Sequence, residues 1–118
     1  PSAAPGYSAE NFEAFGLLAC GIHDWNAGDV ESGGAAIEQF AKSSPHAPDE
    51  WVAELKPITS PYLADYRRYI ELRDAAKIAT GDGVAAVLTR IEQARTEVKT
   101  GTPIITKLEE LSGTLKAQ

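Results

Sequence analysis

The chain has 118 residues, a formal net charge of −6 and an isoelectric point near 4.8. Apolar residues make up 43% and charged residues 24%, an ordinary globular composition that argues against a disordered, fibrous or membrane protein. A chain of this length corresponds to one domain, which we expect over residues 8–118. Residues 1–7, rich in proline and small side chains, are predicted to be a flexible linker to a larger protein.

Charge is distributed unevenly along the chain. Residues 1–59 carry nine acidic residues and two lysines, whereas residues 60–118 carry nine basic and eight acidic residues. Nucleic-acid binding needs clustered lysine and arginine, so we expect no nucleic-acid partner. The acidic half is either a solvated surface or a docking surface for a basic partner.

Cys20 is the single cysteine, which excludes an intrachain disulfide and a four-cysteine zinc site. One free thiol is compatible with the cytoplasm, and also with the periplasm if an upstream signal or anchor has been removed. No run of 18 apolar residues occurs, so we expect no membrane-spanning segment.

The first predicted helical hairpin covers residues about 8–44. Ser8 is a suitable N-cap, and apolar residues then recur at spacings of three and four. Gly28 suits the left-handed position after a helix, and Asp29 is a natural cap for the next one. The second helix contains Gly33 and Gly34, each of which lowers helix propensity by about 1 kcal/mol. We expect another helix to cross close to these glycines.

A second hairpin is predicted over residues about 48–79. Pro48 opens a short third helix, and Ser60-Pro61 begins a fourth helix that runs to about residue 79. The third hairpin covers residues 83–117, where Gly101 separates two helices so closely that they must be antiparallel. The last helix carries the clearest apolar stripe of the chain: Ile104, Leu108, Leu111 and Leu115.

No segment alternates apolar and polar residues between hairpin signals. The predicted fold class is therefore all-α, an array of antiparallel hairpins with about six helices. The hairpin over residues 83–117 would serve as a C-terminal cap.

The segment from Leu17 to Pro45 has small and large residues at recognisable offsets. Gly21 is a small residue in the first helix, Gly28-Asp29 forms the turn, and the bulky Val30 follows it. In these features the segment resembles a tetratricopeptide repeat, a helix–turn–helix of about 34 residues.

The segment also departs from the repeat pattern. Asp24 occupies an aromatic position, Gly33 replaces an alanine, and Phe40 stands where a small residue is expected. The resemblance covers a quarter of the chain. It implies a scaffold that binds peptides or proteins on a helical face, without catalysis.

Candidate catalytic and metal-binding residues are few. His23 and Asp24 are adjacent, so they point about 100° apart on a helix, and Cys20 has only His23 as a base partner by spacing. His46, with Asp49 or Glu50 close by, supplies one nitrogen ligand. We therefore predict no catalytic residue, no metal site and no cofactor.

Tyrosine and arginine gather within one predicted helix, which contains Arg67 and Arg68 as well as a row of residues at spacings of four and three: Tyr62, Tyr66, Tyr69 and Arg73. These residue types are enriched at interface hot spots, although tyrosines packed between helices would give the same pattern. With Trp25 and Asp24 from the first hairpin, the row forms our predicted partner-binding surface.

The predicted function is a non-enzymatic protein–protein interaction module that binds a protein or peptide. The first alternative is an assembly domain that forms a homodimer through an exposed helical face. The second is a small-ligand-binding helical domain, which would need a deep pocket with convergent polar groups. The apolar stripe of the last helix separates the first two, because an exposed stripe would favour self-association.

Overall fold

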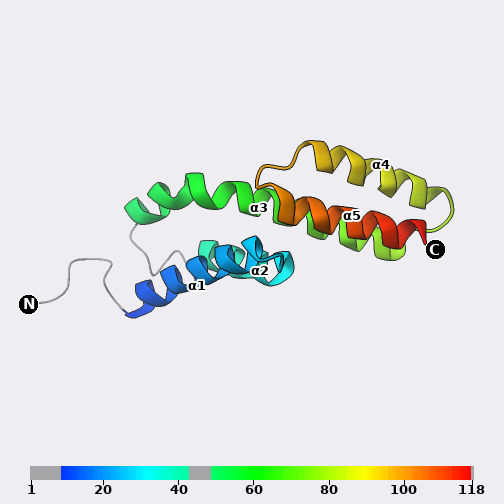
Figure 1. Ribbon diagram of the computed structural model, residues 1–118. Helices are drawn as coiled ribbons and strands as arrows, with labels where there is room; N and C mark the ends of the chain where they lie inside the picture. The colour runs from blue at the N-terminus through cyan, green and yellow to red at the C-terminus, as the bar shows by residue number, and fades with distance from the viewer. Residues whose placement is uncertain (1–8, 43–48, 118) are drawn as a thin grey trace, which may run out of the picture. The chain divides into compact units, whose positions relative to one another are not determined.

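The computed structural model describes residues 9–42 and 49–117 (Figure 1). All regular structure in these residues is helical, which confirms the predicted all-α class. The described part contains five helices: α1 (Ala9–Asn26), α2 (Val30–Lys42), α3 (Asp49–Ile78), α4 (Asp82–Thr96) and α5 (Thr102–Lys116). The predicted linker over residues 1–7 and the loop around Pro45 lie outside the described residues.

The predicted count of six helices is wrong, because α3 is one continuous helix where a hairpin over residues 48–79 was expected. Its 30 residues include Pro57 and Pro61. A proline in a helix interior removes one backbone hydrogen bond and costs about 3 kcal/mol, which is why Ser60-Pro61 suggested a new helix start.

Burial on both sides of the prolines favours a continuous helix. Leu55 and Leu63 pack against the core formed with α1 and α2, while Leu72 and Ala76 are buried further along the same helix. The apolar surface that these side chains bury stabilises both parts of the helix and helps to offset the hydrogen bonds that the prolines lack.

The chain divides into two compact units, unit 1 over residues 1–63 and unit 2 over residues 64–118. Helix α3 contributes its first part to unit 1 and its second part to unit 2.

In unit 1, α1 and α2 cross at two glycines. A Cβ atom on Gly33 would lie 2.5 Å from the carbonyl oxygen of Gly21 and 2.7 Å from the backbone nitrogen of Trp25. The turn before α2 uses Gly28 at a φ of 102°, and the side chain of Asp29 accepts a hydrogen bond from the backbone N–H of Ser32 at 3.1 Å. The close crossing and the cap predicted from the sequence are therefore both present.

The core of unit 1 is built from all three of its helical segments. Leu18 from α1 packs with Ile37 and Phe40 from α2, and residues of α3 cover this cluster. The rings of Phe15 and Phe40 lie 6.0 Å apart between centroids. Trp25 and Val30, on either side of the α1–α2 turn, have no exposed surface.

Unit 2 consists of the second part of α3 together with the α4–α5 hairpin. The connection between α4 and α5 is short, and the two helices form the predicted antiparallel hairpin (Figure 1). Arg95 of α4 pairs with Glu109 of α5 at 2.9 Å. The apolar stripe of α5 is largely internal, since Ile104, Leu108 and Leu115 are buried.

Candidate functional site

The predicted partner-binding residues of unit 1 are mainly packing residues. The side chain of Trp25 is 0% exposed, and its ring stacks edge-on against Tyr62 with centroids 5.3 Å apart. Asp24 is half-buried, and its backbone carbonyl accepts a hydrogen bond from the N–H of Asp29 at 2.9 Å. Because Trp25 is enclosed, it belongs to the core of unit 1 and has no surface to offer a partner.

The remaining predicted residues lie in unit 2, on the second part of α3. Tyr69 is buried at 5% exposure, whereas Tyr66 is half-buried. Arg73 is also half-buried and has an ion pair with Asp74 at 3.5 Å. A docking role for this row stays a prediction, but the burial of Tyr69 shows that part of the row packs within the helical bundle.

A surface groove of about 400 Å³ lies between α3 and α4 in unit 2. We call it the arginine groove, because Arg67 and Arg68 of α3 and Arg90 of α4 line it. Three of the five arginines in the chain thus meet at one place. The rest of the lining is mixed in character: Ala64, Glu71, Leu72 and Gln93.

Two arginines of the groove form ion pairs that connect α3 with α4 and with Glu97, the residue directly after α4. Arg68 Nη1 contacts Glu97 Oε2 at 2.9 Å, and Arg90 Nη2 contacts Glu71 Oε1 at 2.8 Å. Gln93 Nε2 also donates to the other carboxylate oxygen of Glu97, at 3.5 Å. All four charged side chains of these pairs are between 40% and 69% exposed, so the pairs are solvated.

The charge of Arg68 affects the ionisation of Glu97. The hydrogen bond from its guanidinium, reinforced by its positive charge and by the hydrogen bond from Gln93, holds the pKa of Glu97 below the ordinary 4.5. A lowered carboxyl pKa contributes stability above the unfolded-state pKa, and this contribution is lost as the pH falls through the folded-state pKa.

We expect Arg68→Gln to raise the pKa of Glu97 toward 4.5, because both the strongest hydrogen bond and the charge are removed. An NMR titration of the Glu97 carboxyl carbon measures this shift. Arg90→Gln is the matched control, since Arg90 pairs with Glu71 and should leave the Glu97 titration unchanged. An unchanged pKa in Arg68→Gln would show that the ion pair is not formed in solution.

Asp65 fixes the α4–α5 connection beside this groove. Its buried carboxylate accepts hydrogen bonds from the backbone N–H groups of Lys99 and Thr100 and from the hydroxyl of Thr100, at distances between 2.7 and 3.2 Å. Charge-assisted bonds of this kind are about twice as strong as neutral ones. Asp65 therefore holds the α4–α5 connection against α3.

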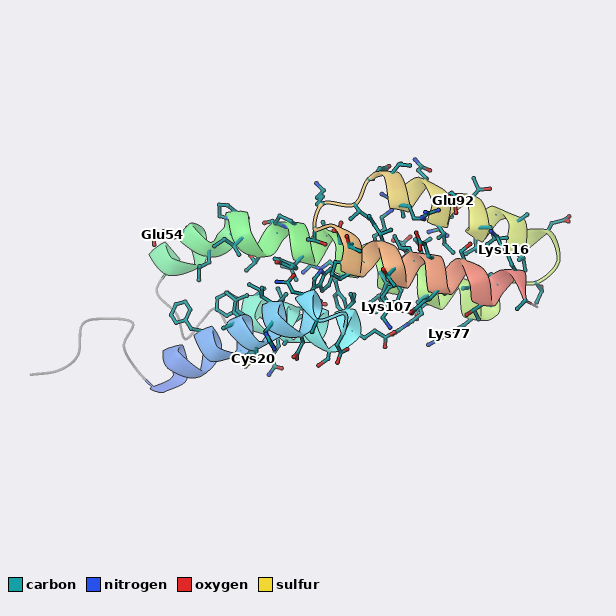
Figure 2. The ribbon with its side chains drawn as sticks, in the orientation of Figure 1. Cys20, Glu54, Lys77, Glu92, Lys107 and Lys116 are labelled. Atoms are coloured by element: carbon teal, nitrogen blue, oxygen red, sulfur yellow. The ribbon has the colours of Figure 1, made fainter. Side chains whose placement is uncertain are left out.

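The candidate chemical residues named from the sequence do not assemble into a cluster in the described ranges. Cys20 and His23 are exposed on α1, and the figure labels Cys20 (Figure 2). His46 lies outside the described residues. Among residues 9–42 and 49–117, no group of three or more His, Cys, Asp or Glu side chains is placed to hold a metal ion. No helix in the described part of the chain is long and apolar enough to cross a membrane.

Comparison of the chain with protein-family models, curated proteins and solved structures finds no match. Arg67 and Arg68 stood out in the sequence but were not included in the predicted partner-binding surface. Arg90 was not connected with them. The crowding of arginines in one helix was the available signal, whereas the contribution of α4 depends on how the two helices align.

Proposed function

We propose that the protein is a non-enzymatic interaction module that binds an anionic segment of a partner protein in the arginine groove. The observation that carries this proposal is the meeting of three arginines on two helices of a chain with net charge −6. Guanidinium groups recognise carboxylates and other planar or multivalent anions through paired N–H donors. The rest of the exposed lining is mixed, with Ala64 beside Glu71 and Gln93, which suits a peptide that carries small and polar side chains besides its acidic ones.

We also propose that unit 1 is a tetratricopeptide-like scaffold element. Gly21 supports this, because the repeat has a small residue at this place in its first helix and Gly21 lies against α2, where an added Cβ would meet Ala36, Gly33 and Ile37 at 3.0 Å. The Gly28-Asp29 turn between α1 and α2 is further support. In this proposal unit 1 is the scaffold and unit 2 carries the binding groove.

The burial of the α5 stripe favours an interaction module over self-association through that helix. Ile104, Leu108 and Leu115 are at most 2% exposed, so they have little surface to offer a second copy. This supports the predicted capping role of α5 in unit 2.

Binding of an acidic peptide pool tests the proposal. We expect a fluorescein-labelled pool with glutamate at alternate positions to bind more tightly than a matched pool with glutamine, by fluorescence anisotropy. Arg67→Gln and Arg90→Gln should each weaken this binding about tenfold, since each removes a charge-assisted hydrogen bond.

The control variant is Arg95→Gln. Arg95 is paired with Glu92 and Glu109 and does not line the groove, so its loss should leave peptide affinity unchanged. Equal affinities for the glutamate and glutamine pools would overturn the proposed function. Equal weakening by all three substitutions would show that binding follows overall charge.

A further inference from the structure

We propose that the arginine groove recognises a phosphorylated serine or threonine on the partner segment, with Arg68 and Arg90 as the principal donors. This inference rests on the proposed function and specifies the anionic group. The two arginines come from different helices and line the same groove. In this proposal a phosphoryl group in the groove takes hydrogen bonds from one guanidinium of each helix.

The existing ion pairs leave donor capacity in both guanidiniums. Arg68 and Arg90 each use one nitrogen to contact one carboxylate oxygen, and no other partner of either side chain is found within the described residues. A guanidinium has five N–H donors. Each arginine can accordingly bind further acceptor atoms.

The carboxylates that hold the arginines are readily displaced. Glu71 is 69% exposed and Glu97 is 43% exposed, so both can return to water at low cost. Solvated ion pairs of this kind contribute little to stability. They hold the guanidiniums at the groove and can give way to a stronger anion.

The choice of a phosphoryl group follows from competition with these internal carboxylates. A carboxylate from a partner exchanges one carboxylate contact for another, and the internal partner has the advantage of high effective concentration. A phosphoryl group carries a charge of about −1.5 to −2 and three strong acceptor oxygens, so it competes for these guanidiniums more strongly than a single carboxylate does. Arginine clusters are a recurring solution for recognising phosphorylated segments.

Three matched peptide pools test the inference with the full chain. The first has glutamate at alternate positions, the second has phosphoserine in place of the central glutamate, and the third has serine there. We expect the phosphoserine pool to bind about tenfold more tightly than the glutamate pool, and the serine pool to bind most weakly. Equal affinities for the first two pools would overturn the inference and leave the proposed function intact. If none of the three peptide pools bound, both the inference and the proposed function would be overturned.

Lysine substitutions distinguish the phosphoryl contact from general attraction. Arg68→Lys and Arg90→Lys keep the charge but remove the planar fork, which pairs with carboxylates as well as with phosphoryl oxygens. Affinity for both pools should fall, but the phosphoserine pool should lose more, so the preference for phosphoserine should fall several-fold. Arg95→Lys is the control and should keep the preference. An unchanged preference in the two groove variants would contradict the assignment of Arg68 and Arg90.

Competition with inorganic phosphate tests whether the groove recognises a phosphorylated peptide or the free anion. A peptide site requires contacts beyond the phosphoryl group, so inorganic phosphate should displace the phosphoserine pool only at concentrations far above the peptide affinity. Displacement at a concentration equal to the peptide affinity would show a site for the free anion and overturn the inference.

Discussion

Gly33→Ala is expected to lower the free energy of unfolding of unit 1 by about 3 kcal/mol. The added methyl group would lie 2.5 Å from the carbonyl oxygen of Gly21 and 2.7 Å from the backbone nitrogen of Trp25. Both obstructing atoms belong to the backbone of α1, so no side chain can rotate away. The two helices must separate, and the buried contacts of Ile37 are then weakened. Urea unfolding followed by tryptophan fluorescence measures the loss, because Trp25 and Trp51 both belong to unit 1.

Gly16→Ala is the matched control for this substitution. Gly16 lies in α1, and a Cβ atom placed on it meets no atom within 4 Å. Alanine is a better helix former than glycine, so we expect the unfolding free energy to rise by up to about 1 kcal/mol. The pair of variants thus makes the same chemical change with opposite results. Similar urea midpoints for Gly33→Ala and the unsubstituted chain would show that α1 and α2 do not cross at these glycines.

Asp65→Ala is expected to destabilise unit 2 by about 3 kcal/mol. The substitution removes every hydrogen bond between the α3 carboxylate and residues 99–100, and it leaves two backbone N–H groups in a partly buried place without an acceptor. Amide hydrogen exchange at Lys99 and Thr100 should speed up strongly, and the far-UV circular dichroism midpoint in urea should fall.

Asp74→Ala provides the comparison on the same helix. Asp74 is 59% exposed and pairs with Arg73 at 3.5 Å and with Lys77 at 3.8 Å. Lys77 is labelled in Figure 2. Exposed pairs contribute at most about 1 kcal/mol, so this variant should remain close to the unsubstituted chain in stability and in exchange at Thr100. Equal effects of the two substitutions would contradict the anchoring role of Asp65.

Local signals in the sequence were sufficient for much of unit 1 and for the last hairpin. The cap at Asp29 and the turn at Gly28 follow from backbone chemistry that involves only neighbouring residues. The close crossing at Gly33 could be expected because glycine destabilises a helix, and a close helix crossing is a structural reason for glycine at such a position. The antiparallel α4–α5 hairpin follows from a connection too short for any other arrangement.

Features that depend on distant contacts could not be predicted in this way. Local rules favour a break at Ser60-Pro61, but the helix continues because its two ends pack into different compact units. Trp25 and Tyr69 were expected at a binding surface, yet aromatic side chains serve cores and interfaces equally well, and only burial separates the two roles. Arg68 and Arg90 line the same groove because of how α3 aligns with α4, and the spacing of apolar residues in the sequence does not specify that alignment.

The uninterrupted course of α3 has a consequence for making shorter versions of the protein. Serine before proline is among the best beginnings for a helix, since the serine oxygen accepts the first free N–H groups and proline fits the first turn. In the intact chain Ser60 and Pro61 are internal and this capacity is unused. A fragment that begins a few residues before Ser60 would carry its own helix start, and would retain Asp65 and all of α4 and α5. To express unit 2 by itself, the fragment should therefore begin just before Ser60 and not at residue 64, where the two units divide.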